Sequence, residues 1–120
     1  MTSKWLTSTS ETDMSAWFTF WRDLVLPFWD ENLETAVREG RLTKTIYEWL
    51  DEEPIRWETA QQGFRAVASI TVDEVISKLD LPSDTSSLLD VGGGHGLYAV
   101  GLCRDHPTLS ATVFDNPAAL

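Results

Sequence analysis

The chain has 120 residues and a formal charge of −10, from 19 acidic and 9 basic side chains. This length suits one small domain, the charge argues against a nucleic-acid-binding surface, and no stretch approaches the roughly 18 apolar residues of a membrane span. Without a signal peptide we expect a cytoplasmic protein, and one cysteine, Cys103, excludes an internal disulfide and predicts no metal site. The acid-rich, lysine-poor composition would also suit a high-salt cytoplasm.

The first third of the chain predicts two helices. Thr12 or Asp13 caps the first helix, and Pro27 is expected to end or kink it because proline lacks an N–H. Asp30 is expected to cap the second helix, which Gly40 stops. The apolar residues of the first helix fall at helical spacing: Trp17, Trp21, Leu24, Val25 and Phe28.

Two further helices are predicted before a change in character. Thr45 and Glu48 fit a capping box that opens a short helix. Residues 55–79 read as one long amphipathic helix, in which Gly63 and residues 69–72, which are weak helix formers, permit a bend. Residues 81–86 then predict a turn.

The last part predicts strand, glycine turn, helix, strand and acid. Residues 87–91 and 111–114 are the strands, residues 97–104 the helix, and Asp115 the acid. The chain is therefore predicted to be mainly α, with the first β-α-β unit of a Rossmann-like α/β fold. One such unit cannot bury both faces of its strands. We therefore expect a piece of a longer protein, or a sheet covered by its own helices or another subunit.

Three glycines alternate between the first strand and the helix: Gly92, Gly94 and Gly96. Glycine permits positive φ and lets a ligand approach the backbone closely. Asp115, at the end of the next strand, can accept hydrogen bonds from the ribose hydroxyls of an adenosine. The alternative is a glycine turn used only for packing.

The glycine spacing separates two cofactors. Dinucleotide-binding folds favour G-x-G-x-x-G, whereas here Leu97 follows Gly96 and Asp90 precedes the run. S-adenosylmethionine (SAM) has no pyrophosphate and suits a shorter loop with acids nearby. A nicotinamide-dependent oxidoreductase remains the alternative.

Residues 89–96, Leu-Asp-Val-Gly-Gly-Gly-His-Gly, resemble motif I of class I SAM-dependent methyltransferases, with the triple glycine of small-molecule O-methyltransferases. Residues 113–117, Val-Phe-Asp-Asn-Pro, resemble that family's second signature, with Asn116 in place of its usual leucine. The resemblance implies methyl transfer from SAM to a small molecule, with oxygen as the expected acceptor. It implies these cofactor-binding residues: Asp90, which supports the loop, Gly92, Gly94, Gly96 and Asp115.

The resemblance also implies an organisation. Residues 1–84 would form a helical segment that builds a homodimer and roofs the substrate pocket, and residues 85–120 would begin the SAM-binding domain. The family's catalytic histidine lies later, beyond Leu120, so no catalytic residue is assigned here. His95 is interpreted as a loop residue and His106 as a helix-end residue. A catalytically inert helical dimerisation module is a further alternative.

The remaining conspicuous residues have competing interpretations. Five tryptophans can line an aromatic pocket, a partner groove or a dimer interface, but helical spacing favours core packing: Trp17, Trp21, Trp29, Trp49 and Trp57. Cys103 is expected to be a buried small apolar residue.

Overall fold

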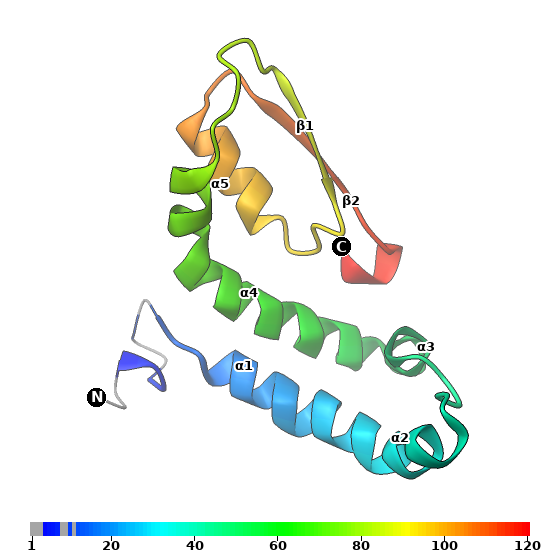
Figure 1. Cartoon of the computed structure of the whole chain (residues 1–120). Coiled ribbons are helices and arrows are strands. Elements are labelled where there is room, and N and C mark those ends of the chain that lie inside the picture. Colours follow the sequence, from blue (N-terminus) through cyan, green and yellow to red (C-terminus); the bar gives the residue numbers. More distant parts are fainter. Residues whose placement is uncertain (1–3, 8–9, 11) are drawn as a thin grey trace.

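The computed structural model describes residues 4–7, 10 and 12–120. The elements are α1 (Ser15–Phe20), η2 (Trp21–Val25), α2 (Leu26–Glu39), α3 (Ile46–Asp51), α4 (Pro54–Lys78), β1 (Ser87–Val91), α5 (Leu97–Asp105), β2 (Ser110–Phe114) and η3 (Pro117–Ala119). In Figure 1, α1 and α2 lie along one side of α4, and the β-α-β unit lies on the other. The predicted fold class, mainly α with one β-α-β unit, is confirmed.

The first two predicted helices are one continuous helical rod. Asp30 lies inside α2, so its prediction as a helix cap is wrong, and Pro27 lies in the first turn of α2 without ending the rod. The turn before the proline, Trp21–Val25, is a π-helix. Its wider hydrogen-bond register accommodates a residue that has no N–H to donate. Gly40 does stop the rod, in the left-handed conformation with φ of 67°.

The predicted capping box of the short helix is confirmed, whereas the first helix has Met14 at its N-cap rather than the predicted Thr12 or Asp13. The Asp13 carboxylate accepts a hydrogen bond from the Ser15 N–H at 3.0 Å, although Met14 is the residue at the cap position. The capping box of α3 is complete: Glu48 N–H donates to Thr45 Oγ1, and Thr45 N–H donates to Glu48 Oε2 at 2.7 Å. Both interactions satisfy N–H groups that a helix start leaves unpaired.

The hydrophobic core lies between the rod, α3 and the first half of α4. Its buried residues are Phe20, Leu24, Val25, Phe28, Trp49, Leu50, Trp57, Ala60 and Ala119. Ala119 belongs to η3, so the segment after β2 packs on the helical part of the chain. Gly63 lies inside the continuous helix α4 and lets the rod approach, because a Cβ there would lie 2.6 Å from Phe20 Cβ.

This close approach gives a stability prediction. Gly63→Ala should lower the free energy of unfolding by about 1–2 kcal/mol, because the overpacking outweighs the roughly 1 kcal/mol that alanine gains in helix propensity. Urea denaturation measures the change. The matched control is Gln62→Ala on the exposed face of α4, which should stabilise the protein slightly. Equal behaviour of the two variants would contradict the packing role of Gly63.

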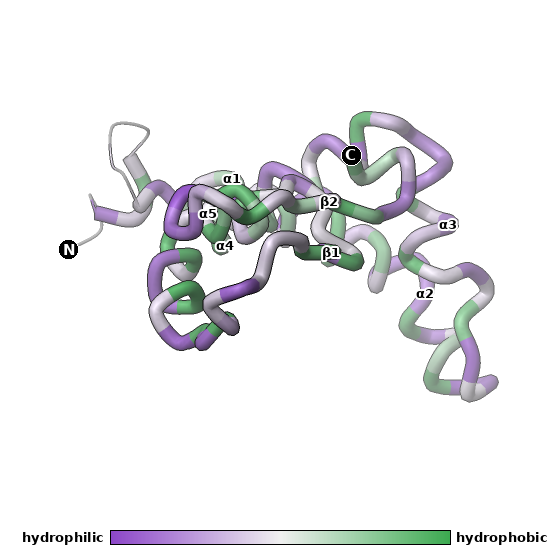
Figure 2. The backbone as a smooth tube through the Cα atoms, turned by 90° about the horizontal axis from the view of Figure 1, so that it is seen from above, coloured by the Kyte–Doolittle hydropathy of each residue, from purple (hydrophilic) through white to green (hydrophobic). Residues whose placement is uncertain are grey.

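The two strands are parallel and in register from Ser87 opposite Ser110 to Val91 opposite Phe114. Helix α5 covers one face of this pair. On the other face large apolar side chains remain exposed, among them Leu89 at 61% and Phe114 at 65%. Figure 2 shows the apolar colouring of both strands. The described residues thus cover only one side of the sheet.

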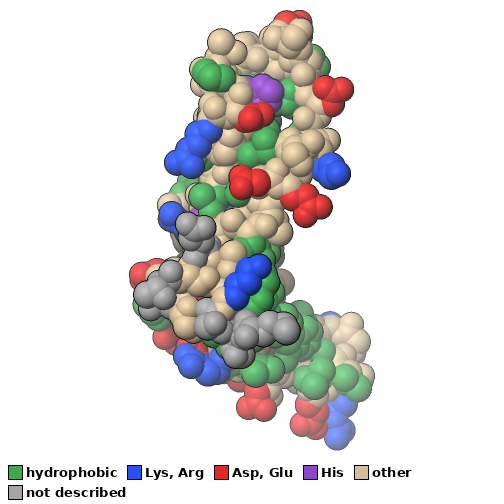
Figure 3. Space-filling model, turned by 90° about the vertical axis from the view of Figure 1, so that its left-hand side faces the viewer, with side chains coloured by type: hydrophobic (Ala, Val, Ile, Leu, Met, Phe, Trp, Pro, Cys, Tyr) green, Lys and Arg blue, Asp and Glu red, His purple; other side chains and the backbone are tan. Residues whose placement is uncertain are grey.

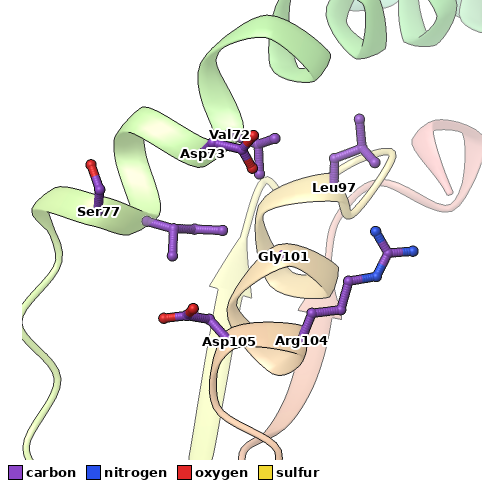
Figure 4. A pocket seen from close by; sticks show the side chains of 8 residues that line it. Val72, Asp73, Ser77, Leu97, Gly101, Arg104 and Asp105 are labelled. Carbon is purple, nitrogen blue, oxygen red and sulfur yellow. The ribbon is translucent and has the colours of Figure 1, made fainter.

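Helix α5 is also fixed to α4. Gly101 faces α4, where a Cβ would lie 2.5 Å from Ile76 Cδ1, and Figure 4 shows it lining a pocket between the two helices. The hydroxyls of Thr71 and Tyr98 are 2.8 Å apart and share a hydrogen bond. Cys103, on α5, is half-buried rather than buried, so that prediction is corrected. Cys103 stays partly exposed because α5 is a short helix beside a sheet that is covered on one side only.

The surface charges are mixed. On the face shown in Figure 3, acidic and basic side chains are interspersed. Among the described residues, no helix combines the length and apolar composition that crossing a membrane requires.

Candidate cofactor site

The loop between β1 and α5 takes a conformation that side chains disfavour. Gly92, Gly94 and Gly96 have φ of 75°, 44° and 68°. Residues other than glycine rarely adopt these angles. The Gly96 N–H donates to the Gly93 carbonyl oxygen at 2.8 Å, which closes the turn directly before α5. The positive φ at each of these three positions therefore requires glycine.

Asp115 ties this loop to the end of β2. Its Oδ2 accepts a hydrogen bond from the Gly94 N–H at 2.7 Å, and its Oδ1 accepts from the Asn116 N–H at 2.7 Å. The Gly92 N–H donates to the Phe114 carbonyl oxygen at 2.7 Å. Each carboxylate oxygen has a further lone pair. Asp115 can thus orient the loop and still accept hydrogen bonds from a ligand.

Asp90 turns its carboxylate toward the same loop. A Cβ on Gly93 would lie 2.6 Å from both Cγ and Oδ2 of Asp90, so the carboxylate occupies the space a side chain would need. Asp90 Oδ2 is buried and has no hydrogen-bond partner among the described residues. Gly93 lies between the alternating glycines and has no positive φ, so only the nearby Asp90 carboxylate requires glycine at this position.

Helix α4 supplies the opposite wall of the site. A pocket of about 230 Å³ separates it from the glycine loop, lined by Tyr47, Trp57, Gln61, Phe64, Gly92, Gly93, Gly94, His95, Asp115, Asn116 and Ala119. This is below the roughly 300–1,000 Å³ of typical small-molecule sites. Four of the predicted residues meet at this corner: Asp90, Gly92, Gly94 and Asp115. Gly96 lies behind them, buried at the start of α5.

The aromatic residues of this wall were predicted only as a group. Trp57 is buried, its Nε1–H donates to Asp51 Oδ1 at 2.7 Å, and its ring stacks on Tyr47 with centroids 6.2 Å apart. Trp57 therefore serves both the core and the pocket. Trp49 is also buried, whereas Trp21 and Trp29 are exposed at 45% and 40%. Core packing thus describes only some of the tryptophans.

His95 is a structural member of the loop. Its Nδ1 accepts a hydrogen bond from the Leu97 N–H at 3.1 Å. Burial, and then the positive charge of Arg65, lower the pKa of His95 from its ordinary value of 6.5. His95 is thus held neutral at neutral pH, as a hydrogen-bond acceptor in the loop.

The lowered pKa of His95 predicts a pH dependence of stability. The unfolded chain binds a proton at this histidine more readily than the folded chain, so its contribution is present above pH 6.5 and is lost as the pH falls below it. His95→Gln should lose less stability than the wild type between pH 7.5 and pH 5.5. Urea denaturation across this range measures it, with each protein referred to its own value at pH 8. A steeper loss in the variant would contradict the prediction.

No group of three or more His, Cys, Asp or Glu side chains in the described part of the chain is arranged to hold a metal ion. The donors and acceptors gathered at the loop are backbone N–H groups, two carboxylates and one amide. This set fits an organic ligand with hydroxyl and amino groups.

Comparison with known proteins agrees with this geometry. A family model described as an O-methyltransferase domain matches residues 22–120. Among curated proteins, a 3-hydroxy-5-methyl-1-naphthoate 3-O-methyltransferase from Streptomyces sahachiroi is 39% identical over 85 residues, which cover 68% of this chain and 24% of that protein. The N,N-dimethyltransferase OxyT from Streptomyces rimosus is 31% identical over 93 residues, 72% of this chain and 27% of OxyT.

Solved structures share the fold. Human N-acetylserotonin methyltransferase in complex with SAM has a TM-score of 0.79 at 24% identity, over 98% of this chain and 36% of that one. An O-methyltransferase family protein from Burkholderia thailandensis has a TM-score of 0.77 at 23% identity, over 98% and 35% of the two chains. The chain thus spans about a quarter of the curated relatives and about a third of these structures.

Proposed function

Since the chain belongs to the O-methyltransferase domain family, we propose that it binds SAM between the glycine loop and α4, as part of an enzyme that methylates a small molecule. The observation that carries this proposal is the bond from the Gly94 N–H to Asp115, which joins an open glycine loop to an acid at the next strand end. The neighbouring structures of PigF with SAH and of the SAH-bound CalO1 support the same class of ligand.

The proposed cofactor contacts are those the sequence singles out. Asp115 accepts hydrogen bonds from the ribose hydroxyls through the lone pairs that Gly94 and Asn116 leave free. Gly92 and Gly94 let the amino-acid end approach the backbone. Asp90 supports the loop through its carboxylate, which lies against Gly93, and Gly96 joins the loop to the start of α5.

When bound, SAM would supply an activated methyl group for transfer to the acceptor oxygen, with S-adenosylhomocysteine as the leaving group and a base taking the hydroxyl proton. The residues of this chain contribute binding and orientation, which are large terms in such a displacement. His95 Nδ1 already accepts the Leu97 N–H, so we assign no general base to it. No described residue is therefore proposed as the base that takes the acceptor's proton.

For the acceptor we propose an aromatic compound with a hydroxyl group. Tyr47, Trp57 and Phe64 present aromatic surface to the pocket, and flat ring systems pack well on such surface. The curated relative from Streptomyces sahachiroi is named for a hydroxynaphthoate, which is of this class. OxyT is named for N,N-dimethyl transfer, so an aromatic amine is the comparison substrate.

For the helical segment, residues 1–84, we propose a homodimer interface and a roof over the substrate, with residues 85–120 beginning the SAM-binding domain. Large apolar side chains stay exposed along one face of α2: Leu26, Trp29, Leu33 and Val37. Such a stripe favours burial against a second copy. Light scattering should give a dimer in solution; a monomer would contradict this part. We place the protein in the cytoplasm.

Calorimetry on the natural polypeptide that carries these residues tests the function. SAM and its product S-adenosylhomocysteine should bind, and NAD should not. Binding of NAD alone would favour the oxidoreductase, and binding of none would favour an inert helical module. Methyl transfer to hydroxynaphthoates, with aminonaphthoates as the comparison, then tests the acceptor atom.

A further inference from the structure

Gln61 has a buried polar atom without a partner. Its side chain projects from α4 onto the glycine loop, where a Cβ on Gly94 would lie 2.7 Å from Oε1 and 3.0 Å from Nε2. Oε1 is buried and accepts no hydrogen bond from the described residues. Most buried polar atoms have a hydrogen-bond partner, because an unsatisfied one destabilises the fold, so an unpartnered acceptor points to a ligand.

The nearby groups of the chain do not supply the missing donor. The Gly94 N–H is already given to Asp115, and the Gly96 N–H to the Gly93 carbonyl. The second unpartnered oxygen of this corner, Asp90 Oδ2, is also an acceptor. Two buried acceptors at one loop call for a ligand rich in N–H donors.

The loop offers the complementary half as well. Within the described part of the chain, no acceptor is found for the backbone N–H groups of Gly93 and His95. Free backbone N–H groups in a glycine loop suit a carboxylate. Acceptors on one side and donors on the other match a zwitterionic amino acid, which carries an ammonium and a carboxylate on one carbon.

We propose that Gln61 Oε1 accepts a hydrogen bond from the α-ammonium group of the amino-acid end of SAM, which makes Gln61 a cofactor-selecting residue outside the glycine motif. This proposal rests on the proposed function. Independently of any ligand, the Gln61 amide fills the space that a side chain at position 94 would need, which is a second requirement for glycine there.

The test compares two ligands that differ in the amino-acid end, which carries the proposed contact. S-adenosylhomocysteine carries the amino-acid end, whereas 5′-methylthioadenosine keeps the adenine, ribose and thioether but lacks it. Gln61→Leu should weaken S-adenosylhomocysteine about tenfold or more, the value of a hydrogen bond to a charged group, and leave methylthioadenosine within about twofold. Calorimetry on the natural polypeptide measures both.

Two further variants control the interpretation. Gln61→Glu keeps the shape and an acceptor, so it should hold S-adenosylhomocysteine within a fewfold of the wild type; a loss as large as that of Gln61→Leu would mean that Gln61 donates to the carboxylate instead and would overturn the proposal. Gln62→Leu, on the exposed neighbour, should leave both ligands unchanged.

The outcomes separate this proposal from the function on which it rests. If Gln61→Leu weakens both ligands equally, Gln61 only shapes the loop, and the contact to the amino-acid end is wrong while SAM binding stands. If the wild-type protein binds neither ligand, the proposed function fails, and the contact fails with it.

Discussion

Asp115→Ala is expected to weaken binding of S-adenosylhomocysteine at least about 100-fold. Two ligand hydroxyls lose a charged acceptor, and each hydrogen bond to a charged group contributes about 1.5–3 kcal/mol. The same substitution frees the N–H groups of Gly94 and Asn116. The loop therefore loses its tie to β2, in addition to the ligand losing its partner.

Asp115→Asn separates these two effects. The amide keeps one acceptor oxygen of similar position, so it can hold the Gly94 N–H while losing the charge and half of the acceptor capacity. Its affinity is expected to fall about tenfold, between the wild type and the alanine variant. Calorimetry with S-adenosylhomocysteine measures the series.

Asp84→Ala is the control for charge, because it removes the same carboxylate from an exposed turn far from the loop. It should bind like the wild type. An Asp115→Ala protein that binds within about threefold of the wild type would remove Asp115 from the site.

The β-α-β unit could be predicted because its signals are local. A strand, a glycine run and a helix follow one another directly, so spacing alone placed Gly92, Gly94 and Gly96. The position of Asp115 at the end of the next strand could be predicted in the same way, whereas its hydrogen bond to Gly94 is seen only in the structure. Such features need no knowledge of distant contacts.

The features that spacing could not give depend on residues far apart in the chain. Gln61 reaches the loop only because α4 passes beneath it, and Gly63 is glycine only because Phe20 lies opposite. In the rod, Pro27 and Asp30 carried strong local signals of a break. The predicted break does not occur, because a π-helical turn and packing on α4 keep the helix continuous. Tertiary contacts here outweigh local preference.

The first three glycines of the loop are required for different reasons. Gly92 needs a positive φ and has open space beside it; Gly93 has an ordinary φ but lies under the Asp90 carboxylate. Gly94 has both constraints, a positive φ and the Gln61 amide against it. Each glycine of this single sequence motif is therefore required by its own structural constraint. Substitutions at the individual positions can distinguish these constraints.

Gly94→Ala is accordingly expected to cost more stability than Gly92→Ala in the unliganded protein. Both variants acquire the backbone strain of a left-handed alanine, about 1–2 kcal/mol. Only alanine at position 94 also meets the Gln61 amide, at 2.7 Å from Oε1. These atoms are the far end of a flexible side chain, so moving them adds about 0.5–1.5 kcal/mol to the loss in the free energy of unfolding.

A double-mutant cycle isolates the contribution of the amide. In a Gln61→Ala background the Cβ at position 94 meets no amide, so Gly94→Ala should fall back to the strain alone, near the value of Gly92→Ala. Urea denaturation of the four proteins gives the coupling between the two positions. Additive losses would show that the amide yields freely to a methyl group, and the packing of Gln61 on Gly94 would then place no demand on the loop sequence.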